Sequence, residues 1–339
     1  MEIREVKSDV ISAVAKQVFG SHSVIDSIAE IRPTSDYGIP RISGCNKHLS
    51  YVVRLADHPQ RYVFRFSRGY RENQFEKEVS NYKLIANETN IPTPKIYTVD
   101  RTTTAAPTPY MVMGWMPGDI WTFLTHALNP GTNEVEKEEI AWKAGLAYSQ
   151  IHNIERTALN TRATIEKLLY RIDQLRHVVQ DHQFDIDINK LDACRRVIEN
   201  DESLLLQMES LCVNDAELHF LRTDGIWNPS FICDMEWVDF GEPCLELAKL
   251  CMPKEFWELD SLFVLENAHS VSDRSFFKGY ETKRHINYDK LSRLAPYAHL
   301  DYMCAITDQV YRAVKKDFMK SLQPKYVTLV DGILEVGRR

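Results

Sequence analysis

The chain has 339 residues, which is enough for one large two-lobed protein or for two domains with an ample core. Its net charge of −7 argues against a general nucleic-acid-binding protein, and no apolar run reaches the length of a membrane span. The seven cysteines are scattered without a Cys-x-x-Cys pair, which argues against a structural zinc site and favours a reducing compartment. Because the N-terminal residues are charged and lack an apolar signal core, we expect a cytoplasmic protein.

The first predicted elements are a hairpin and a helix. Residues 51–55 and 62–66 are rich in β-branched and aromatic residues and are separated by a turn that contains proline, so they are typical of paired strands. The loop of residues 43–46, Ser-Gly-Cys-Asn, leads into this hairpin. Residues 72–86 place apolar side chains at helical spacing, and the prolines within residues 90–94 end that helix.

The middle and the end of the chain are mainly helical. Residues 110–113 form an apolar run that predicts a buried strand, and the Gly-Trp-Met-Pro-Gly of residues 114–118 breaks it. Apolar side chains at helical spacing then predict helices over residues 140–153, through most of residues 160–210, and over residues 285–334.

A second hairpin carries two aspartates at its ends. Residues 219–221 and 230–233 are of strand type, and Thr223-Asp224-Gly225 between them is typical of a turn. Since a hairpin brings its two ends together, we expect Asp215 and Asp234 to face one cleft.

Two such carboxylates are what phosphate transfer requires. One accepts the proton of the attacking hydroxyl, and the other holds the magnesium ion that neutralises the phosphate charge. The alternative is a pair of exposed turn aspartates. The acidic and apolar residues that follow at 242–248 favour the functional interpretation.

These residues resemble the aminoglycoside phosphotransferase family, relatives of the protein kinases that phosphorylate hydroxyls of small molecules. The family reads His-Gly-Asp, Ile-Asp-x-Glu, Gly-Asp-Pro and Asp-Leu-Ala, and this chain has, in the same order, Val213-Asn214-Asp215, Cys233-Asp234-Met235-Glu236, Gly241-Glu242-Pro243 and Glu246-Leu247-Ala248. Asp239-Phe240-Gly241 spells a protein-kinase motif, but Asp234 stands at the strand end where the metal ligand belongs.

The resemblance implies an α+β, bilobal protein-kinase-like fold. The N-lobe, an antiparallel sheet plus a helix, would cover residues 1–113. The hinge would be formed by residues 114–118. The C-lobe would cover residues 119–339 and be mainly helical, with the catalytic hairpin. Within it, the helices of residues 160–210 would form either one wall of the acceptor site or a plain covering pair.

The resemblance also assigns ATP and Mg²⁺ as cofactors, with ATP between the lobes. Gly44 and Asn46 would lie in the loop that covers the phosphates. Arg65 takes the place of the usual strand lysine that pairs with the α- and β-phosphates, and Glu78 would pair with it, with Arg54 and Glu76 as rivals for these two roles.

The hinge would bind adenine through its backbone. Met113 and Met116 would pack near the purine, and Trp115 lies between them in the same segment. His152, at the end of the helix of residues 140–153, would have a structural role under the catalytic loop.

In the catalytic hairpin, Asp215 would be the base and Asp234 the metal ligand. The family's metal-binding Asn falls on Phe220, and His219 is the nearby ligand type, although imidazole suits magnesium less well than oxygen. An alternative alignment places Asn214 at the base position and His219 in register, but it loses the carboxylate. We therefore prefer Asp215.

The expected partner is a small-molecule hydroxyl acceptor, with no nucleic acid and no membrane, and the protein would be a monomer or homodimer. Glu236, Asp239 and Glu242 would attract a cationic acceptor or would merely form an acidic loop. An aminoglycoside, another antibiotic, choline, a sugar and homoserine all stay open. A pseudokinase that serves as a binding module is the main alternative, and a protein kinase is disfavoured because His-Arg-Asp and Ala-Pro-Glu are absent.

Overall fold

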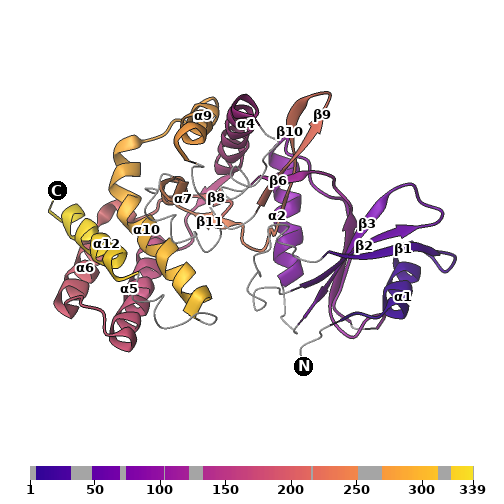
Figure 1. Ribbon diagram of the computed structural model, residues 1–339, viewed down its shortest axis with the longest axis horizontal. Helices are drawn as coiled ribbons and strands as arrows, with labels where there is room; N and C mark the ends of the chain where they lie inside the picture. Colours follow the sequence, from indigo (N-terminus) through magenta and orange to yellow (C-terminus); the bar gives the residue numbers. More distant parts are fainter. Residues whose placement is uncertain are drawn as a thin grey trace. The chain divides into compact units, whose positions relative to one another are not determined.

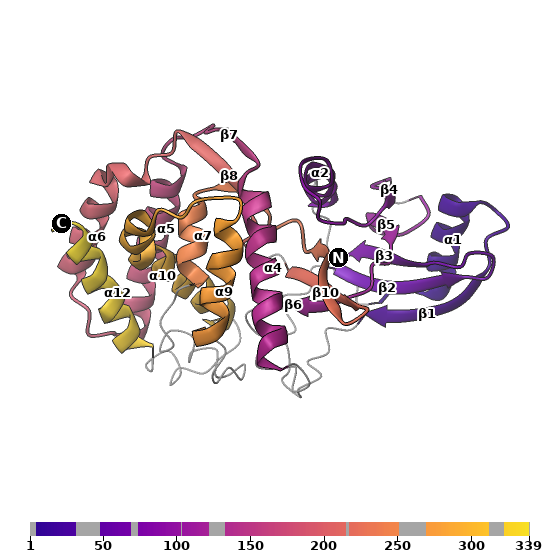
Figure 2. The ribbon, with the colours of Figure 1, turned by 90° about the horizontal axis from the view of Figure 1, so that it is seen from above.

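The structure is a computed structural model. It describes the following ranges: residues 5–31, 48–68, 74–102, 104–121, 133–214, 217–250, 269–311 and 322–338. The chain divides into two compact units (Figures 1 and 2), with unit 1 formed by Met1–Trp121 and Asp215–Val238 and unit 2 by Thr122–Asn214 and Asp239–Arg339. The residues of the second hairpin, which the sequence assigns to the C-lobe, therefore group with unit 1.

Unit 1 is built on a five-stranded antiparallel sheet in the order β1-β2-β3-β5-β4. The strands are β1 (Ile25–Ile31), β2 (His48–Leu55), β3 (Arg61–Ser67), β5 (Tyr110–Gly114) and β4 (Ile96–Asp100). The predicted hairpin is confirmed as β2 and β3, and the predicted apolar strand is confirmed as β5.

The two faces of this sheet pack against different helices. Phe64 and Phe66 of β3 join an apolar core with α1 (Ser8–Phe19), a helix that the sequence analysis missed. Side chains alternate along a strand, so Arg65 between them points to the opposite face. There it contacts Glu78 of α2 (Gln74–Glu88), which confirms the helix predicted over residues 72–86.

The second hairpin is also confirmed, as β9 (Glu217–Thr223) and β10 (Ile226–Cys233), with β6 (Asp119–Trp121) paired on the other edge of β9. Asp224 and Gly225 connect the two strands with φ values of 53° and 78°. A two-residue turn with positive φ at both positions matches the twist of paired strands, and Asp-Gly is a favoured sequence for it.

Unit 2 is mainly helical. Its helices are α4 (Glu134–His152), α5 (Ala163–His182), α6 (Ile188–Asn200), the short η1 (Glu202–Leu204), α7 (Pro243–Leu250), α9 (His269–Glu281), α10 (Tyr288–Tyr311) and α12 (Gln323–Val336). A small antiparallel sheet has the order β11 (Asp239–Gly241), β8 (Met208–Cys212) and β7 (Glu155–Thr157). Apolar side chains of α5, α6, α10 and α12 form the main core. Together the two units give the predicted α+β, protein-kinase-like architecture.

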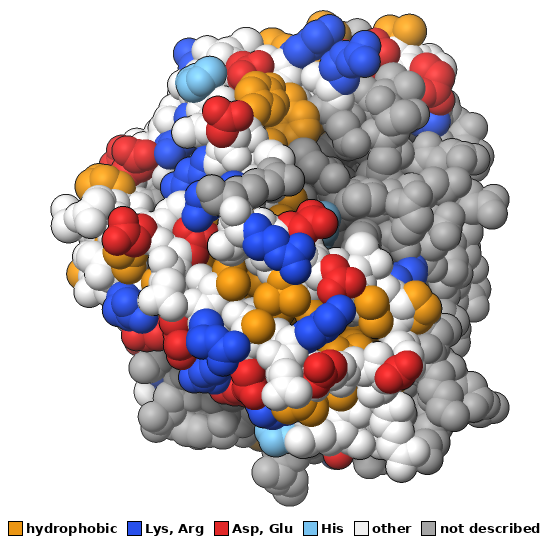
Figure 3. Space-filling model, turned by 90° about the vertical axis from the view of Figure 1, so that its left-hand side faces the viewer, with side chains coloured by type: hydrophobic (Ala, Val, Ile, Leu, Met, Phe, Trp, Pro, Cys, Tyr) orange, Lys and Arg blue, Asp and Glu red, His pale blue; other side chains and the backbone are white. Residues whose placement is uncertain are grey.

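One face of unit 2 carries many charged side chains. Figure 3 views its end near the C-terminus, where basic, acidic and apolar side chains are interspersed. In the same unit, the pair of Lys190 and Asp331 connects α6 with α12, and that of Arg195 and Asp173 connects α6 with α5. Among the helices that the structure describes, none combines the length and apolarity needed to cross a membrane.

Two glycines allow α4 and α9 to cross closely. A Cβ atom on Gly145 would lie 1.9 Å from the carbonyl oxygen of Phe276, and one on Gly279 would lie 1.8 Å from that of Trp142. Both distances are much shorter than a van der Waals contact. The atoms that a Cβ would meet belong to the backbone, which cannot rotate away as a side chain can. The two helices therefore have to separate if either glycine gains a side chain.

We expect Gly145→Ala to lower the free energy of unfolding by roughly 3 kcal/mol, measured by urea denaturation, because overpacking forces the backbone apart. Gly332→Ala in α12 is the matched control, since its Cβ would lie 3.6 Å from Pro296, an ordinary contact. That change should leave stability equal or slightly higher, because alanine favours helix. Equal unfolding midpoints for the two variants would contradict the close crossing.

Candidate active site

A buried ion pair between Arg65 and Glu78 lies at the centre of unit 1. The Arg65 Nη1 group donates to Glu78 Oε1, and both side chains are almost fully buried. The rival residues are more exposed: Arg54 pairs with Asp26 at 3.4 Å, and Glu76 pairs with Arg101. The structure therefore brings Arg65 and Glu78 together and gives their rivals surface partners.

Asp234 joins this pair from the second hairpin. Its Oδ1 lies 3.5 Å from Arg65 Nη2, and its side chain is 43% exposed. The residue follows the last residue of β10 and has a φ of 54°, a left-handed conformation that aspartate tolerates better than most residues. The carboxylate thus combines contact with a buried cation and access to solvent.

Glu236 is the third carboxylate around Arg65. Its Oε2 lies 4.0 Å from Arg65 Nη2, and its Oε1 lies 3.6 Å from Nε2 of His48, a residue that the sequence analysis missed. Burial raises the pKa of Glu236, but the hydrogen bond from His48 and the charge of Arg65 outweigh it and lower the pKa to about 2. Glu236, predicted as a residue for a cationic substrate, has Arg65 and His48 as partners within unit 1.

Arg65 is surrounded by three carboxylates, those of Glu78, Asp234 and Glu236, and this excess of negative charge determines the protonation of Glu78. Burial lowers the pKa of Arg65, but Glu78, Asp234 and Glu236 outweigh it, so its pKa is raised and it stays charged. Burial raises the pKa of Glu78 to about 7, because the favourable effect of Arg65 is opposed by the charges of Glu236 and Asp234. One guanidinium cannot neutralise three carboxylates, and Glu78 is the one that takes up a proton.

This gives a pH-dependent contribution to stability. The folded protein holds the Glu78 proton up to about pH 7, compared with 4.5 for the ordinary group. The contribution is therefore complete below that ordinary pKa and is lost as pH rises through the folded value, at up to about 1 kcal/mol per pH unit. In Glu78→Gln this part of the pH dependence should vanish, and urea unfolding between these limits compares the variant with the wild type. Parallel curves for the two proteins would contradict the raised pKa.

Asn81 fixes the loop that follows Asp234. Its Nδ2 group donates to the carbonyl oxygens of Met235 at 2.8 Å and Val238 at 2.9 Å, and the side chain is buried. Asn81 stands one helical turn after Glu78 on α2, so one helix face holds both the partner of Arg65 and the loop of Asp234. In the sequence, the one hint of this role is that Asn81 is a polar residue one turn after Glu78. It lies on the face of the amphipathic helix that packs against the rest of the protein.

The predicted hinge residues lie at the end of β5. Met113 is buried, whereas Trp115 is 37% exposed. The backbone N–H of Gly114 donates to the carbonyl oxygen of Lys95 at 2.8 Å, and the backbone N–H of Trp115 donates to the carbonyl oxygen of Arg61 at 3.0 Å. These bonds fix the segment to the sheet. Adenine binding by this segment stays a prediction.

His219 lies on the central strand of the small sheet in unit 1. Its ring lies tilted against that of Phe231, with centroids 4.2 Å apart, and its Nε2 lies 3.3 Å from Sγ of Cys233, the residue before Asp234. Burial lowers the pKa of His219 to about 4, so the imidazole is neutral near pH 7. Its role as a second magnesium ligand stays a prediction.

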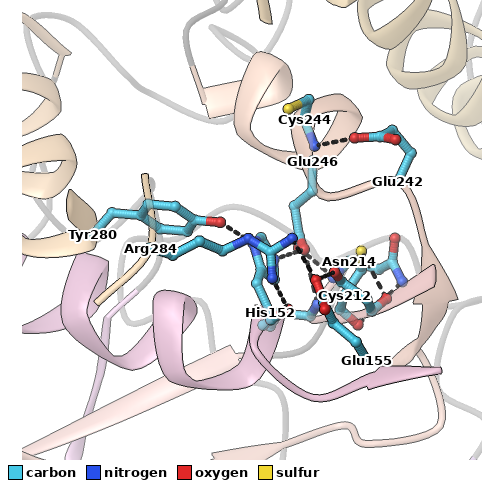
Figure 4. A network of polar contacts seen from close by, with 11 residues as sticks. His152, Glu155, Cys212, Asn214, Glu242, Cys244, Glu246, Tyr280 and Arg284 are labelled. Atoms are coloured by element: carbon cyan, nitrogen blue, oxygen red, sulfur yellow. Dashed lines mark hydrogen bonds and ion pairs between the residues drawn. The ribbon is translucent and has the colours of Figure 1, made fainter. Parts of the chain in front are cut away.

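In unit 2, Glu246 holds the loop that leads to Asp215 (Figure 4). Its carboxylate accepts hydrogen bonds from the backbone N–H groups of Val213 at 2.9 Å and Asn214 at 2.5 Å. Asn214 has a φ of 55° and stands where the family has glycine, and asparagine tolerates this left-handed conformation. Asp215, Gly44 and Asn46 themselves lie outside the described residues.

His152 supports Glu246 from beneath the loop. Its Nε2 donates to Glu246 Oε2 at 2.8 Å, and its Nδ1 shares a hydrogen bond of 2.8 Å with the hydroxyl of Tyr280. Arg284 donates to the carbonyl oxygen of His152 and pairs with Glu155 at 2.8 Å, so the network reaches the surface (Figure 4). Burial raises the pKa of Glu246, but the hydrogen bond with His152 outweighs it and the pKa is lowered.

We expect Glu246→Ala to lower the free energy of unfolding by about 3 kcal/mol and to reduce activity, because it leaves buried N–H groups without an acceptor. Urea denaturation and the transfer rate at saturating substrate would be measured together. Glu134→Ala, which removes an exposed carboxylate from α4, is the control and should cost less than about 0.5 kcal/mol. An unchanged transfer rate in Glu246→Ala would show that the loop needs no support.

The other two predicted substrate acids are engaged within unit 2. Glu242 is buried, accepts from the backbone N–H of Cys244 at 3.0 Å, and binds Lys290 Nζ at 2.6 Å. Asp239 begins β11, and its Oδ1 accepts from the N–H of Phe240 at 2.9 Å. Glu242 therefore has a local structural function, and the binding of a cationic substrate by either carboxylate stays a prediction.

Comparison with solved structures finds the same fold elsewhere. A candidate aminoglycoside phosphotransferase from Ralstonia eutropha JMP134 has a TM-score of 0.63 at 15% identity, covering 98% of this chain and 99% of its own. A thermostable mutant of aminoglycoside phosphotransferase APH(4)-Ia, in a ternary complex with ADP and hygromycin B, has a TM-score of 0.59 at 12% identity, with 98% and 99% covered. An ethanolamine kinase from Plasmodium vivax has a TM-score of 0.51 at 15% identity, with 92% and 81% covered.

The comparison with curated protein sequences gave no match. The family model described as "Phosphotransferase enzyme family" (APH) matches residues 39–270, which is well over half of the chain and includes the cluster around Arg65 and the loop held by Glu246. The chain therefore belongs to the phosphotransferase enzyme family.

Proposed function

We propose that this protein transfers the γ-phosphate of ATP to a hydroxyl group of a small molecule. The observation that carries the proposal is the convergence of Arg65, Glu78 and Asp234 in unit 1, a buried cation with one buried and one accessible carboxylate. Family membership supports the reaction class, and the ADP bound to the APH(4)-Ia structure supports an adenine nucleotide.

The described residues suit a nucleotide with magnesium. Magnesium prefers oxygen ligands and is commonly held by one or two carboxylates together with phosphate oxygens and water. Asp234 offers such a carboxylate, since it is accessible and its loop is fixed by Asn81. When bound, the ion would neutralise phosphate charge. Arg65, held in place by Glu78, would donate to phosphate oxygens.

Asp215 completes the proposed site as the group that receives the proton of the acceptor hydroxyl. It follows Asn214, whose N–H group is held by Glu246, so the preceding backbone is fixed. Positioning and charge neutralisation supply most of the rate in such reactions, which is consistent with a network that fixes backbone rather than side chains alone.

A binding module without transfer activity is the second candidate. The observation in its favour is Phe220, which stands at the family's second metal-ligand position, is buried in β9 and offers no oxygen. The neutral His219 beside it is a weak substitute.

The test is a thermal unfolding scan with ATP and Mg²⁺, followed by a phosphate-transfer assay with a panel of hydroxyl compounds. We expect a nucleotide-dependent rise in the unfolding temperature, because a ligand that binds only the native state must stabilise it. Transfer to at least one compound supports the kinase. Stabilisation without transfer favours the binding module, and no stabilisation at millimolar ATP contradicts the proposed function.

A further inference from the structure

The loop that carries Asp234 combines an unfavourable backbone conformation with a long hydrogen bond. The φ of 54° at Asp234 costs free energy relative to right-handed backbone, although less for aspartate than for most residues. Within the loop, the N–H of Trp237 donates to the carbonyl oxygen of Asp234 at 3.1 Å. The N–H of Val238 donates to the carbonyl oxygen of Met235 at 3.3 Å, which is longer than most hydrogen bonds between such groups.

Asn81 adds two shorter hydrogen bonds to the same loop from α2. Its Nδ2 group has two hydrogens, and it donates to the carbonyl oxygen of Met235 at 2.8 Å and to that of Val238 at 2.9 Å. These are the two residues that the long backbone bond joins, so one amide group bridges both ends of that turn. All three residues are buried, and a buried carbonyl oxygen that loses its donor is costly.

The helix that presents Asn81 is itself anchored in unit 1. Tyr82 and Ile85 of α2 are buried, and Glu78, one turn before Asn81, pairs with Arg65 of β3. The amide of Asn81 therefore extends from an element that is held at several points. Through it, the loop of Asp234 is held by a helix more than 150 residues earlier in the chain.

The rigidity of this loop bears on which ion a carboxylate at residue 234 can hold. The direction in which a side chain leaves the backbone follows from φ and ψ, so bonds that fix the loop also fix its carboxylate. Mg²⁺ requires nearly ideal octahedral geometry at about 2.1 Å from oxygen, whereas Ca²⁺ accepts irregular arrangements at about 2.4 Å. A carboxylate held in one place therefore suits Mg²⁺, and one free to move adapts to the larger ion.

We propose that Asn81 is a positioning residue for the metal site, and that it holds Asp234 where a small divalent cation is preferred over a larger one. This inference rests on the proposed function, in which Asp234 binds magnesium together with ATP. It adds the residue that gives the site its ion preference. Asn81 acts through the backbone of residues 235–238.

The first test measures the Mg²⁺ concentration that gives half of the ATP-dependent rise in unfolding temperature. Asn81→Leu keeps roughly the size of the side chain and removes both donors, and we expect it to need about tenfold more Mg²⁺ than the wild type. Asn81→Ala leaves space for a water molecule that can donate to the same carbonyl oxygens, so its midpoint should lie between the two. It also keeps the test open if Asn81→Leu does not fold.

Asn87→Leu is the matched control, because Asn87 lies on the same helix but is exposed. We expect it to keep the Mg²⁺ midpoint of the wild type. Equal Mg²⁺ midpoints in the wild type, Asn81→Leu and Asn81→Ala would overturn the proposal.

The second test replaces Mg²⁺ by Ca²⁺ in the same thermal scan. The Ca²⁺ midpoint should rise by no more than about twofold in Asn81→Leu, so the ratio of the Ca²⁺ midpoint to the Mg²⁺ midpoint should fall several-fold. If Asn81 only stabilises the fold, the variant has a lower unfolding temperature without ligand and an unchanged ratio. An unchanged ratio therefore overturns the role of Asn81 in ion preference.

Transfer rates separate this inference from the proposed function. Asn81→Leu should lose activity at low Mg²⁺ and recover most of it at high Mg²⁺, whereas Glu246→Ala, which releases the loop before Asp215, should not recover. A wild type without any Mg²⁺-dependent stabilisation or transfer would contradict the proposed function. A wild type that shows both, with an Asn81→Leu variant that behaves identically, would contradict only the role of Asn81.

Discussion

Asp234→Asn should reduce phosphate transfer by roughly 10²- to 10³-fold without unfolding the protein. The change removes the charge that would hold magnesium but keeps the size of the side chain. It also keeps the backbone, because asparagine tolerates the left-handed conformation that residue 234 adopts with a φ of 54°. The transfer rate with ATP at saturating Mg²⁺ is the first measurement.

The second hairpin provides a closely matched control for this variant. Asp224 has a φ of 53° at the turn of the same hairpin, so Asp224→Asn makes the same chemical change in the same backbone conformation. We expect this control to keep wild-type activity. A further measurement is the rise in unfolding temperature caused by ATP, whose dependence on Mg²⁺ should be lost only in Asp234→Asn. If both variants transfer phosphate at the wild-type rate, Asp234 is not the metal ligand.

Local sequence signals were sufficient to predict many of the strands, turns and helices of unit 1. The hairpin of β2 and β3, the Asp-Gly turn and α2 all have patterns that depend on neighbouring residues, and the structure confirms them. Strand alternation alone did not decide between Arg54 and Arg65, because it does not say which face of a sheet a helix covers. That decision came from α1, which packs on the face of Phe64 and leaves Arg65 to α2.

The missed residues are those whose partners lie far along the chain. Asn81 binds carbonyl groups more than 150 residues away, and Lys167 reaches Asp301 across more than 130 residues. No periodicity relates such positions, and each side chain alone is typical of an ordinary helix surface. The acids of residues 236–242 suggested a cationic substrate, and no sequence signal indicated that Glu236 and Glu242 also contact basic groups of the protein itself. Their role toward a substrate stays a prediction.

The largest effect on stability should come from Arg65→Met. This variant leaves Glu78 buried beside two further carboxylates without their shared cation, and we expect it to lower the free energy of unfolding by about 3–5 kcal/mol. Glu78→Leu should cost less, because Arg65 keeps Asp234 and Glu236 as partners. Arg54→Met, which removes an exposed arginine from the neighbouring strand, should cost less than about 1 kcal/mol.

The double variant Arg65→Met with Glu78→Leu tests the interaction itself. If the cost of Arg65→Met is that of an unpaired buried charge, the double variant should be more stable than Arg65→Met alone, as measured by urea unfolding in a double-mutant cycle. The deficit of Arg65→Met should also shrink as pH falls from about 8 to about 5, because Glu78 without its cation takes up a proton even more readily than in the wild type. The opposite outcome is a loss of stability in Arg65→Met that does not change with pH, together with a double variant whose loss equals the sum of the two single losses. That outcome would mean that Arg65 stabilises unit 1 by packing and that its charge does not interact with the surrounding carboxylates.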